Sequence, residues 1–106
     1  PDSQEGTLTG TASASSKAAG ASGFTQVDYI ILTNTHASTD HTVDLHLVAS
    51  GGTAGSTNKH MGAIDVPHAE TTLVNGPFYL RNGKSLQLAV NTGSNVLYSM
   101  QFQSEI

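Results

Sequence analysis

Two runs of alternating residues, QVDYIILTN (residues 26–34) and HTVDLHLVA (residues 41–49), decide the fold of this chain. Neighbouring residues of a strand point to opposite faces, so alternation of this kind predicts two β-strands. The second run places its valine and leucines on one face and Asp44 and His46 on the other, which predicts one buried and one wet face. The first run is apolar on both faces, as expected of a strand inside a sandwich or against a second subunit.

Short apolar runs follow at close intervals, and each is bounded by turn residues. The turns are PHAE (67–70), NGP (75–77), RNGK (81–84) and TGSN (92–95), and the Asn-Gly pairs supply the positive φ angles of tight turns. No stretch shows helical periodicity. The further strands are predicted at residues 63–66, 71–74, 78–80, 86–90 and 96–102.

About eight strands result, counting a weak one near the N-terminus. The predicted fold is all-β: a two-sheet antiparallel sandwich that is jelly-roll-like, with an immunoglobulin-like sandwich as the alternative, because strand number alone does not order the strands. Leu45 and Leu88 are predicted to lie in its core, since each is centred in an alternating run.

Residues 1–23 differ from the rest and are predicted to be an N-terminal arm or linker, before a β-sandwich domain over residues 24–106. Leu8 is the only large apolar side chain in this segment. Its alternation with neighbouring threonines allows one weak edge strand, followed by a flexible Ser/Ala/Gly linker. A second irregular segment, residues 50–62, is rich in glycine and polar residues and predicts a long loop, which in proteins is usually functional or mobile.

The amino-acid composition excludes two classes of binding partner and favours self-association. Only 11% of residues are charged and the net charge is -4, with four permanent cations, so no basic stripe is available for nucleic acid. No apolar run approaches the ~20 residues of a membrane helix, and no membrane association is expected. The chain has no cysteine, and a domain of this size without disulfides often gains stability by associating with copies of itself.

Catalytic signatures are missing from the sequence. Five histidines suggest a metal site, but His41 and His46 are separated by an odd number of residues and should face opposite ways; a site shared across a symmetry axis stays open. The carboxylates are scattered, and neither a GxSxG elbow, a GxGxxG loop nor a P-loop occurs. The expectation is a protein that is not an enzyme and needs no cofactor.

Four motifs carry a family resemblance: YIILTNT (29–35), VDLHLV (43–48), DVPHAET (65–71) and LVNGPFYLRNGKSLQ (73–87). In this order they resemble the small β-sandwich structural proteins of tailed bacteriophage virions. His68, Ala69 and Glu70 replace a small Ala-Gly pair of that pattern, and the lead before Phe24 also departs from it. The resemblance implies a sandwich that works by binding, as a trimer or another homo-oligomer.

The predicted function is therefore that of a virion structural protein, a capsid decoration or cement protein on the outer capsid surface. Its partners would be the major capsid protein and further copies of itself, as a homotrimer. The alternative is a tail-associated receptor- or glycan-binding module that uses the loop at 50–62. The residues predicted to contact partners are Thr7, Leu8, Thr9 and Thr11 in the arm, Tyr29 and Ile31 in the first run, and Gly51, Gly52, Asn58 and His60 in the loop.

Overall fold

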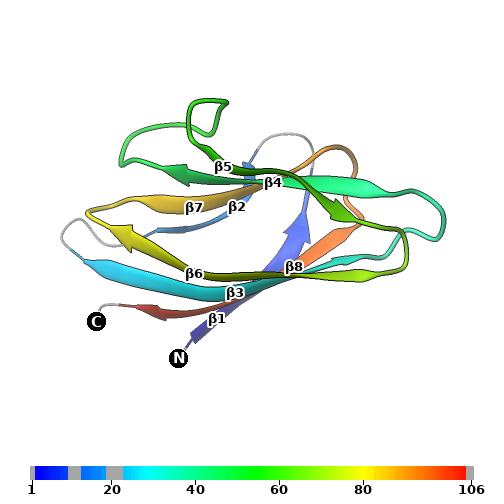
Figure 1. The fold of residues 1–106 in the computed structure, drawn as a ribbon, viewed down its shortest axis with the longest axis horizontal. Helices are drawn as coiled ribbons and strands as arrows, with labels where there is room; N and C mark the ends of the chain where they lie inside the picture. The colour runs from blue at the N-terminus through cyan, green and yellow to red at the C-terminus, as the bar shows by residue number, and fades with distance from the viewer. Residues whose placement is uncertain (1, 10–12, 19–22, 105–106) are drawn as a thin grey trace.

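Two β-sheets lie face to face in a computed structural model that describes residues 2–9, 13–18 and 23–104 (Figure 1). Within these residues the chain forms strands and turns and no helix, so the prediction of an all-β sandwich is confirmed. The strands are β1 (Asp2–Leu8), β2 (Ser13–Ala18), β3 (Phe24–Asn34), β4 (His41–Val48), β5 (Lys59–Val66), β6 (Thr71–Arg81), β7 (Ser85–Val90) and β8 (Val96–Ser104).

The strand order is that of a jelly roll. The first sheet has the order β1-β8-β3-β6 and the second β2-β7-β4-β5, and all neighbouring pairs are antiparallel. The β4–β5 connection stays within one sheet, and each of the other connections crosses to the opposite sheet. An immunoglobulin-like sandwich keeps its first two strands in one sheet, so that alternative is wrong.

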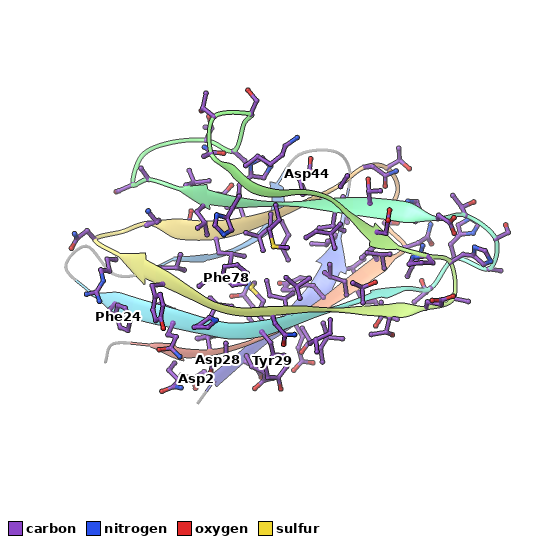
Figure 2. The ribbon with its side chains drawn as sticks, viewed as in Figure 1. Asp2, Phe24, Asp28, Tyr29, Asp44 and Phe78 are labelled. Atoms are coloured by element: carbon purple, nitrogen blue, oxygen red, sulfur yellow. The ribbon has the colours of Figure 1, made fainter. Side chains whose placement is uncertain are left out.

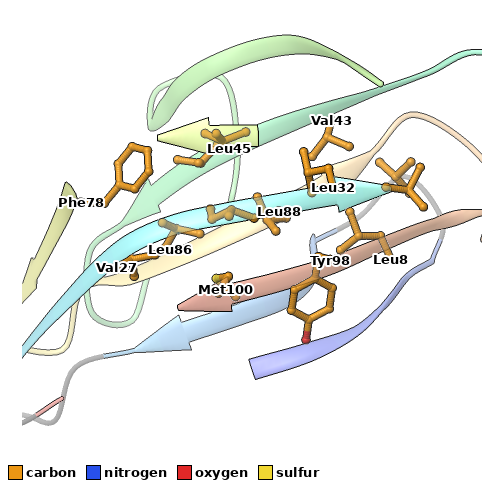
Figure 3. Packing of buried hydrophobic residues seen from close by; sticks show 14 of the residues in the cluster. Leu8, Val27, Leu32, Val43, Leu45, Phe78, Leu86, Leu88, Tyr98 and Met100 are labelled. Atoms are coloured by element: carbon orange, nitrogen blue, oxygen red, sulfur yellow. The ribbon is translucent and has the colours of Figure 1, made fainter. Parts of the chain in front are cut away.

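The core lies between the two sheets and is drawn in Figure 3. Leu45 of β4 and Leu88 of β7 are directly paired and fully buried, which confirms the prediction for both residues. Every strand with described side chains contributes at least one buried apolar residue. The core cluster comprises Leu8, Val27, Ile30, Leu32, Val43, Leu45, Val66, Val74, Phe78, Leu80, Leu86, Leu88, Val90, Val96, Tyr98, Met100 and Phe102.

The N-terminal segment contributes two strands to the sandwich, where the sequence predicts one edge strand and a linker. β1 pairs with β8 along its whole length, from Asp2 opposite Phe102 to Leu8 opposite Val96. β2 falls inside the predicted linker and pairs with β7. Its Ser/Ala-rich sequence carries no apolar alternation, so the strand depends on main-chain pairing with β7 and not on its own pattern.

β6 is one strand where the sequence predicts two strands and a turn at NGP. Val27 of β3 pairs with Phe78 and Tyr29 pairs with Asn75, so Gly76 and Pro77 together oppose Asp28 alone. This irregularity is a β-bulge, which accommodates the extra residue without reversing the chain. The predicted turn at residues 75–77 is therefore wrong.

Two other predicted turns are confirmed by their backbone angles. In RNGK, Asn82 and Gly83 have φ values of 54° and 80°, and the Lys84 N–H donates to the Arg81 carbonyl at 3.0 Å. In PHAE, Ala69 has a φ of 57° and the Glu70 N–H donates to the Pro67 carbonyl. Both turns carry the chain from one sheet to the other.

Candidate binding surfaces

The free face of the first sheet carries large apolar side chains that no other element covers. Leu73 is 55% exposed, Leu97 42% and Tyr29 36%, and Ile31 is partly exposed between them. Figure 2 shows Tyr29 on the side of this sheet that faces away from the second sheet. We call these four residues the apolar stripe, and their exposure together makes this face a candidate contact surface.

The stripe follows from strand register. Ile31 of β3 lies directly opposite Leu73 of β6 on one side and Ser99 of β8 on the other. Leu97 is two residues from Ser99 and therefore points to the same face. Beside the stripe is a shallow groove of about 380 Å³, lined by Ile31, Leu97 and residues 5–7 of β1.

An aromatic pair lies at one end of the same face. The rings of Phe24 and Tyr79 are stacked with their centroids 6.0 Å apart, and the Arg81 guanidinium lies 4.4 Å from the centroid of Phe24. Tyr79 is 53% exposed. Tyrosine and arginine are enriched at energetically important interface positions, so this end resembles a protein-binding surface in composition.

The second candidate site is a pocket of about 600 Å³, open to solvent, on the outer face of the second sheet; we call it the cavity. Its floor is Asp44 and His46 of β4 with Gln87 and Ala89 of β7, and its wall is loop residues 52–56 with Lys59. Figure 2 shows Asp44 on this outer side, near the β4–β5 loop. The loop thus folds back over the sheet and forms a cavity with it.

The wet face predicted for β4 is therefore partly wrong. Asp44 stays partly exposed, but His46 is only 5% exposed and Val48 only 1%. The reason is the loop, because it covers the end of this face, where Val48 and His46 lie. The position of a long loop is not contained in the alternation of the strand beneath it.

Asn58 holds the loop in this position. Its side-chain oxygen accepts the Gly55 N–H at 2.9 Å, and its amide nitrogen donates to the Thr53 carbonyl at 2.7 Å. The same oxygen lies 2.9 Å from Nδ1 of His46. One side chain therefore ties two points of the loop to the outer face of β4.

Three other histidines lie near the opposite end of the sandwich, in or beside the 35–41 and 67–70 turns. The rings of His36 and His41 meet edge to face with their centroids 6.1 Å apart, and Nδ1 of His41 lies 3.0 Å from Oδ1 of Asn91. His68 binds Asp40 twice, through its backbone N–H at 2.9 Å and through Nδ1 at 2.6 Å. These contacts join the turn before β4 to the turn after β5.

The hydrogen bond from the His68 backbone N–H, together with the bond from its side chain, lowers the pKa of Asp40. A lowered folded-state pKa means that this carboxylate adds stability above its unfolded-state pKa of about 3.9. That contribution disappears as the pH falls through the lowered value. Asp40→Asn is expected to lower Tm slightly at pH 5 to 6, with the difference shrinking to zero at the acid end of the titration.

Thermal melts of both proteins at a series of pH values test this. Asp65→Asn is a matched control, because it makes the same substitution at an exposed aspartate on the neighbouring strand β5. A Tm difference between Asp40→Asn and wild type that is constant across pH would contradict the expectation.

The predicted contact residues fall into separate places. Tyr29 and Ile31 belong to the apolar stripe, and Thr7 lines the groove beside it, whereas Leu8 is fully buried in the core and has no surface to offer a partner. Gly52 and Asn58 build the cavity loop.

His60 lies on β5 with its ring edge to face against Phe78, at 5.8 Å between centroids. Gly51 and Thr9 are exposed outside both sites, and Thr11 lies outside the described residues.

Several residues of the two surfaces are not identifiable from the sequence. Leu73 and Tyr79 sit in the alternating strand β6 and have the same pattern as core residues, so only the register reveals that they are exposed. Gln87 and Ala89 contribute to the cavity because β7 lies beside β4.

No group of three or more His, Asp or Glu side chains is placed to hold a metal ion among residues 2–9, 13–18 and 23–104. Over the same part of the chain, the structure contains no helix of the length and apolarity needed to cross a membrane.

Comparisons with known proteins found no matching family model and no matching curated protein. Among solved structures, the chain is similar to chains of the infectious bursal disease virus, from the Gt strain and from the Gx strain. In both cases the TM-score is 0.42 and the sequence identity is 9%, and the match covers 95% and 93% of this chain. The chain spans 29% of the length of each of those viral chains.

Proposed function

We propose that this protein is a structural component of a virion that works by binding, as a capsid decoration or cement protein on the outer surface of the head. The observation that carries the proposal is the apolar stripe on the free face of the first sheet. Leu73 and Leu97 keep 55% and 42% of their surface exposed, side by side with Tyr29 and Ile31 on one face of the first sheet. Such a face serves association and not solubility.

The motif resemblance to virion proteins of tailed phages supports the same proposal. A cement protein joins neighbouring coat subunits, and the proposed partners are the major capsid protein and further copies of this chain in a trimer. The free face is suited to this role because it is formed by paired strands, which hold its side chains rigidly. Rigid contact surfaces lose little conformational entropy on binding.

Binding through the stripe is expected to depend weakly on salt, because the groups involved are apolar. Leu73→Asp places a charge within the stripe, on the edge strand β6, where the side chain is exposed and the fold does not need it. We expect this variant to keep the wild-type Tm but to lose self-association and binding to capsids that have been stripped of the protein. Loss by a factor of about a hundred or more would match one desolvated charge in an interface.

Light scattering at micromolar concentration and co-sedimentation with stripped capsids over a range of salt give the measurement. Thr92→Asp is a matched control, since Thr92 is exposed and lies outside the stripe. Capsid binding by Leu73→Asp at wild-type affinity would refute the stripe as the contact surface. Failure of the wild-type protein to bind capsids, with binding to tails or host cells, would refute the cement function.

A further inference from the structure

The protonation pattern of His46 is determined by Asn58. The side-chain oxygen of Asn58 accepts the Gly55 N–H and its amide nitrogen donates to the Thr53 carbonyl, so the amide has only one consistent orientation. Nδ1 of His46 lies 2.9 Å from that oxygen. An oxygen only accepts, and Nδ1 must therefore carry the proton.

Neutral His46 thus presents Nε2 as a hydrogen-bond acceptor. The ring lines the cavity under the loop, and the side chain is more than nine-tenths buried. Among the residues that the structure describes, the His46 side chain forms one hydrogen bond, through Nδ1 to Asn58, and none through Nε2. An acceptor in a fixed orientation beside a pocket is available to a ligand that donates a hydrogen bond.

The other polar groups of the cavity are a mixed set with cancelling charges. Asp44 and Lys59 form an ion pair at 3.4 Å, so an anionic ligand would meet Asp44 and a cationic ligand would meet Lys59. Gln87 donates through Nε2 to Ser85 Oγ at 2.9 Å, which leaves its oxygen as a further acceptor. The site therefore favours a neutral ligand whose groups both donate and accept.

We propose that this cavity binds a neutral pyranose sugar. Its hydroxyl groups would donate to Nε2 of His46 and to the Gln87 oxygen, and would accept from Lys59. A volume of about 600 Å³ lies within the range of ligand pockets. The proposal does not depend on the cement function, because the cavity lies on the second sheet and the apolar stripe on the first.

The first test needs no ligand. Long-range ¹H–¹⁵N spectra of the labelled protein at neutral pH distinguish the two neutral forms of each imidazole ring. We expect the His46 proton on Nδ1. A proton on Nε2 would remove the free acceptor and overturn the proposal.

The second test is a titration of the labelled protein with the methyl glycosides of glucose, galactose and mannose, up to concentrations on the order of 10 mM, which detects millimolar binding. We expect at least one glycoside to give saturable shifts confined to the lining of the cavity, which is residues 52–56 with Asp44, His46, Lys59, Gln87 and Ala89. Comparison with the free reducing sugar distinguishes a chain-linked unit from a free monosaccharide. Absence of saturable shifts with all of these sugars would overturn the proposal.

Variants separate binding from folding. His46→Asn keeps an amide N–H near the position of Nδ1, for the bond to Asn58, and removes Nε2; we expect about tenfold weaker binding with the fold retained. Ala89→Leu adds bulk to the floor of the cavity at the position opposite Asp44, keeps the His46 side chain, and should weaken binding at least as much. His68→Asn, the same substitution outside the cavity, should leave affinity unchanged. Wild-type affinity in both cavity variants would refute the site.

Discussion

Leu45→Asp is expected to leave the protein unfolded at room temperature. Leu45 is fully buried, lies opposite Leu88 and belongs to the single core between the sheets. An aspartate there would bury a carboxylate with no partner and remove an apolar side chain, at a cost on the order of 5 kcal/mol. Domains of this size have a free energy of unfolding of about 5–15 kcal/mol, so the loss is comparable with the whole stability.

Circular dichroism and a thermal melt provide the measurement. The matched control is Leu73→Asp, which makes the same chemical change at a side chain that is 55% exposed, and it should melt close to wild type. Leu88→Asp should behave like Leu45→Asp, because the two residues face each other across β4 and β7. A cooperative melt of Leu45→Asp near the wild-type Tm would show that the core is not where the structure places it.

Gly76→Ala is expected to be the most damaging Gly→Ala substitution among the glycines whose surroundings the structure describes. A Cβ at this position would lie 2.6 Å from the Val27 carbonyl oxygen, 2.8 Å from the Asp28 carbonyl oxygen and 2.9 Å from the Phe78 nitrogen. All three are backbone atoms of the bulged β3–β6 pair and cannot rotate away. The strands must separate locally, at a cost of about 1–3 kcal/mol or more.

Gly55→Ala serves as its control, because a Cβ at Gly55 meets nothing within 4 Å. Chemical denaturation should give a lower midpoint for Gly76→Ala and a nearly unchanged one for Gly55→Ala. Equal midpoints for wild type and Gly76→Ala would mean that the bulge is more open than the structure shows.

The sandwich could be predicted from the sequence because the apolar residues that alternate in the core strands are the ones that are buried. Val27, Leu45 and Leu88 follow a period of two and are buried as expected. The predicted strand number also agrees with the structure, but through two differences that offset each other: β2 was missed, and β6 was split at Asn75–Pro77. The pattern of neighbouring residues could predict neither strand β2 nor the continuous strand β6. β2 depends on pairing with β7, and the β6 bulge depends on the register of β6 with β3.

The candidate sites were less accessible to sequence reasoning, for a related reason. Tyr29 and Ile31 could be predicted as contact residues, because their strand has apolar side chains on both faces. One face packs in the core, so the other is available to a partner. Leu97 shares its face with Ser99 and Gln101, so its alternation also places it away from the core. Leu73 could not be predicted as a surface residue, since its neighbour Val74 in the same strand is equally apolar. The cavity brings together β4, β7 and the loop, and the meeting of these elements is a property of the topology.

The position of β8 also has a consequence for the speed of folding. β8 lies between β1 and β3, and residue 2 is paired with residue 102, so the first sheet is complete only when the two most distant strands meet. Such high contact order slows two-state folding to milliseconds or seconds, against microseconds for helical bundles. Until β8 inserts, β1 and β3 expose open edges to solvent and to other chains. Refolding yield should therefore fall steeply as protein concentration rises, because strand insertion from the same chain competes with pairing between molecules.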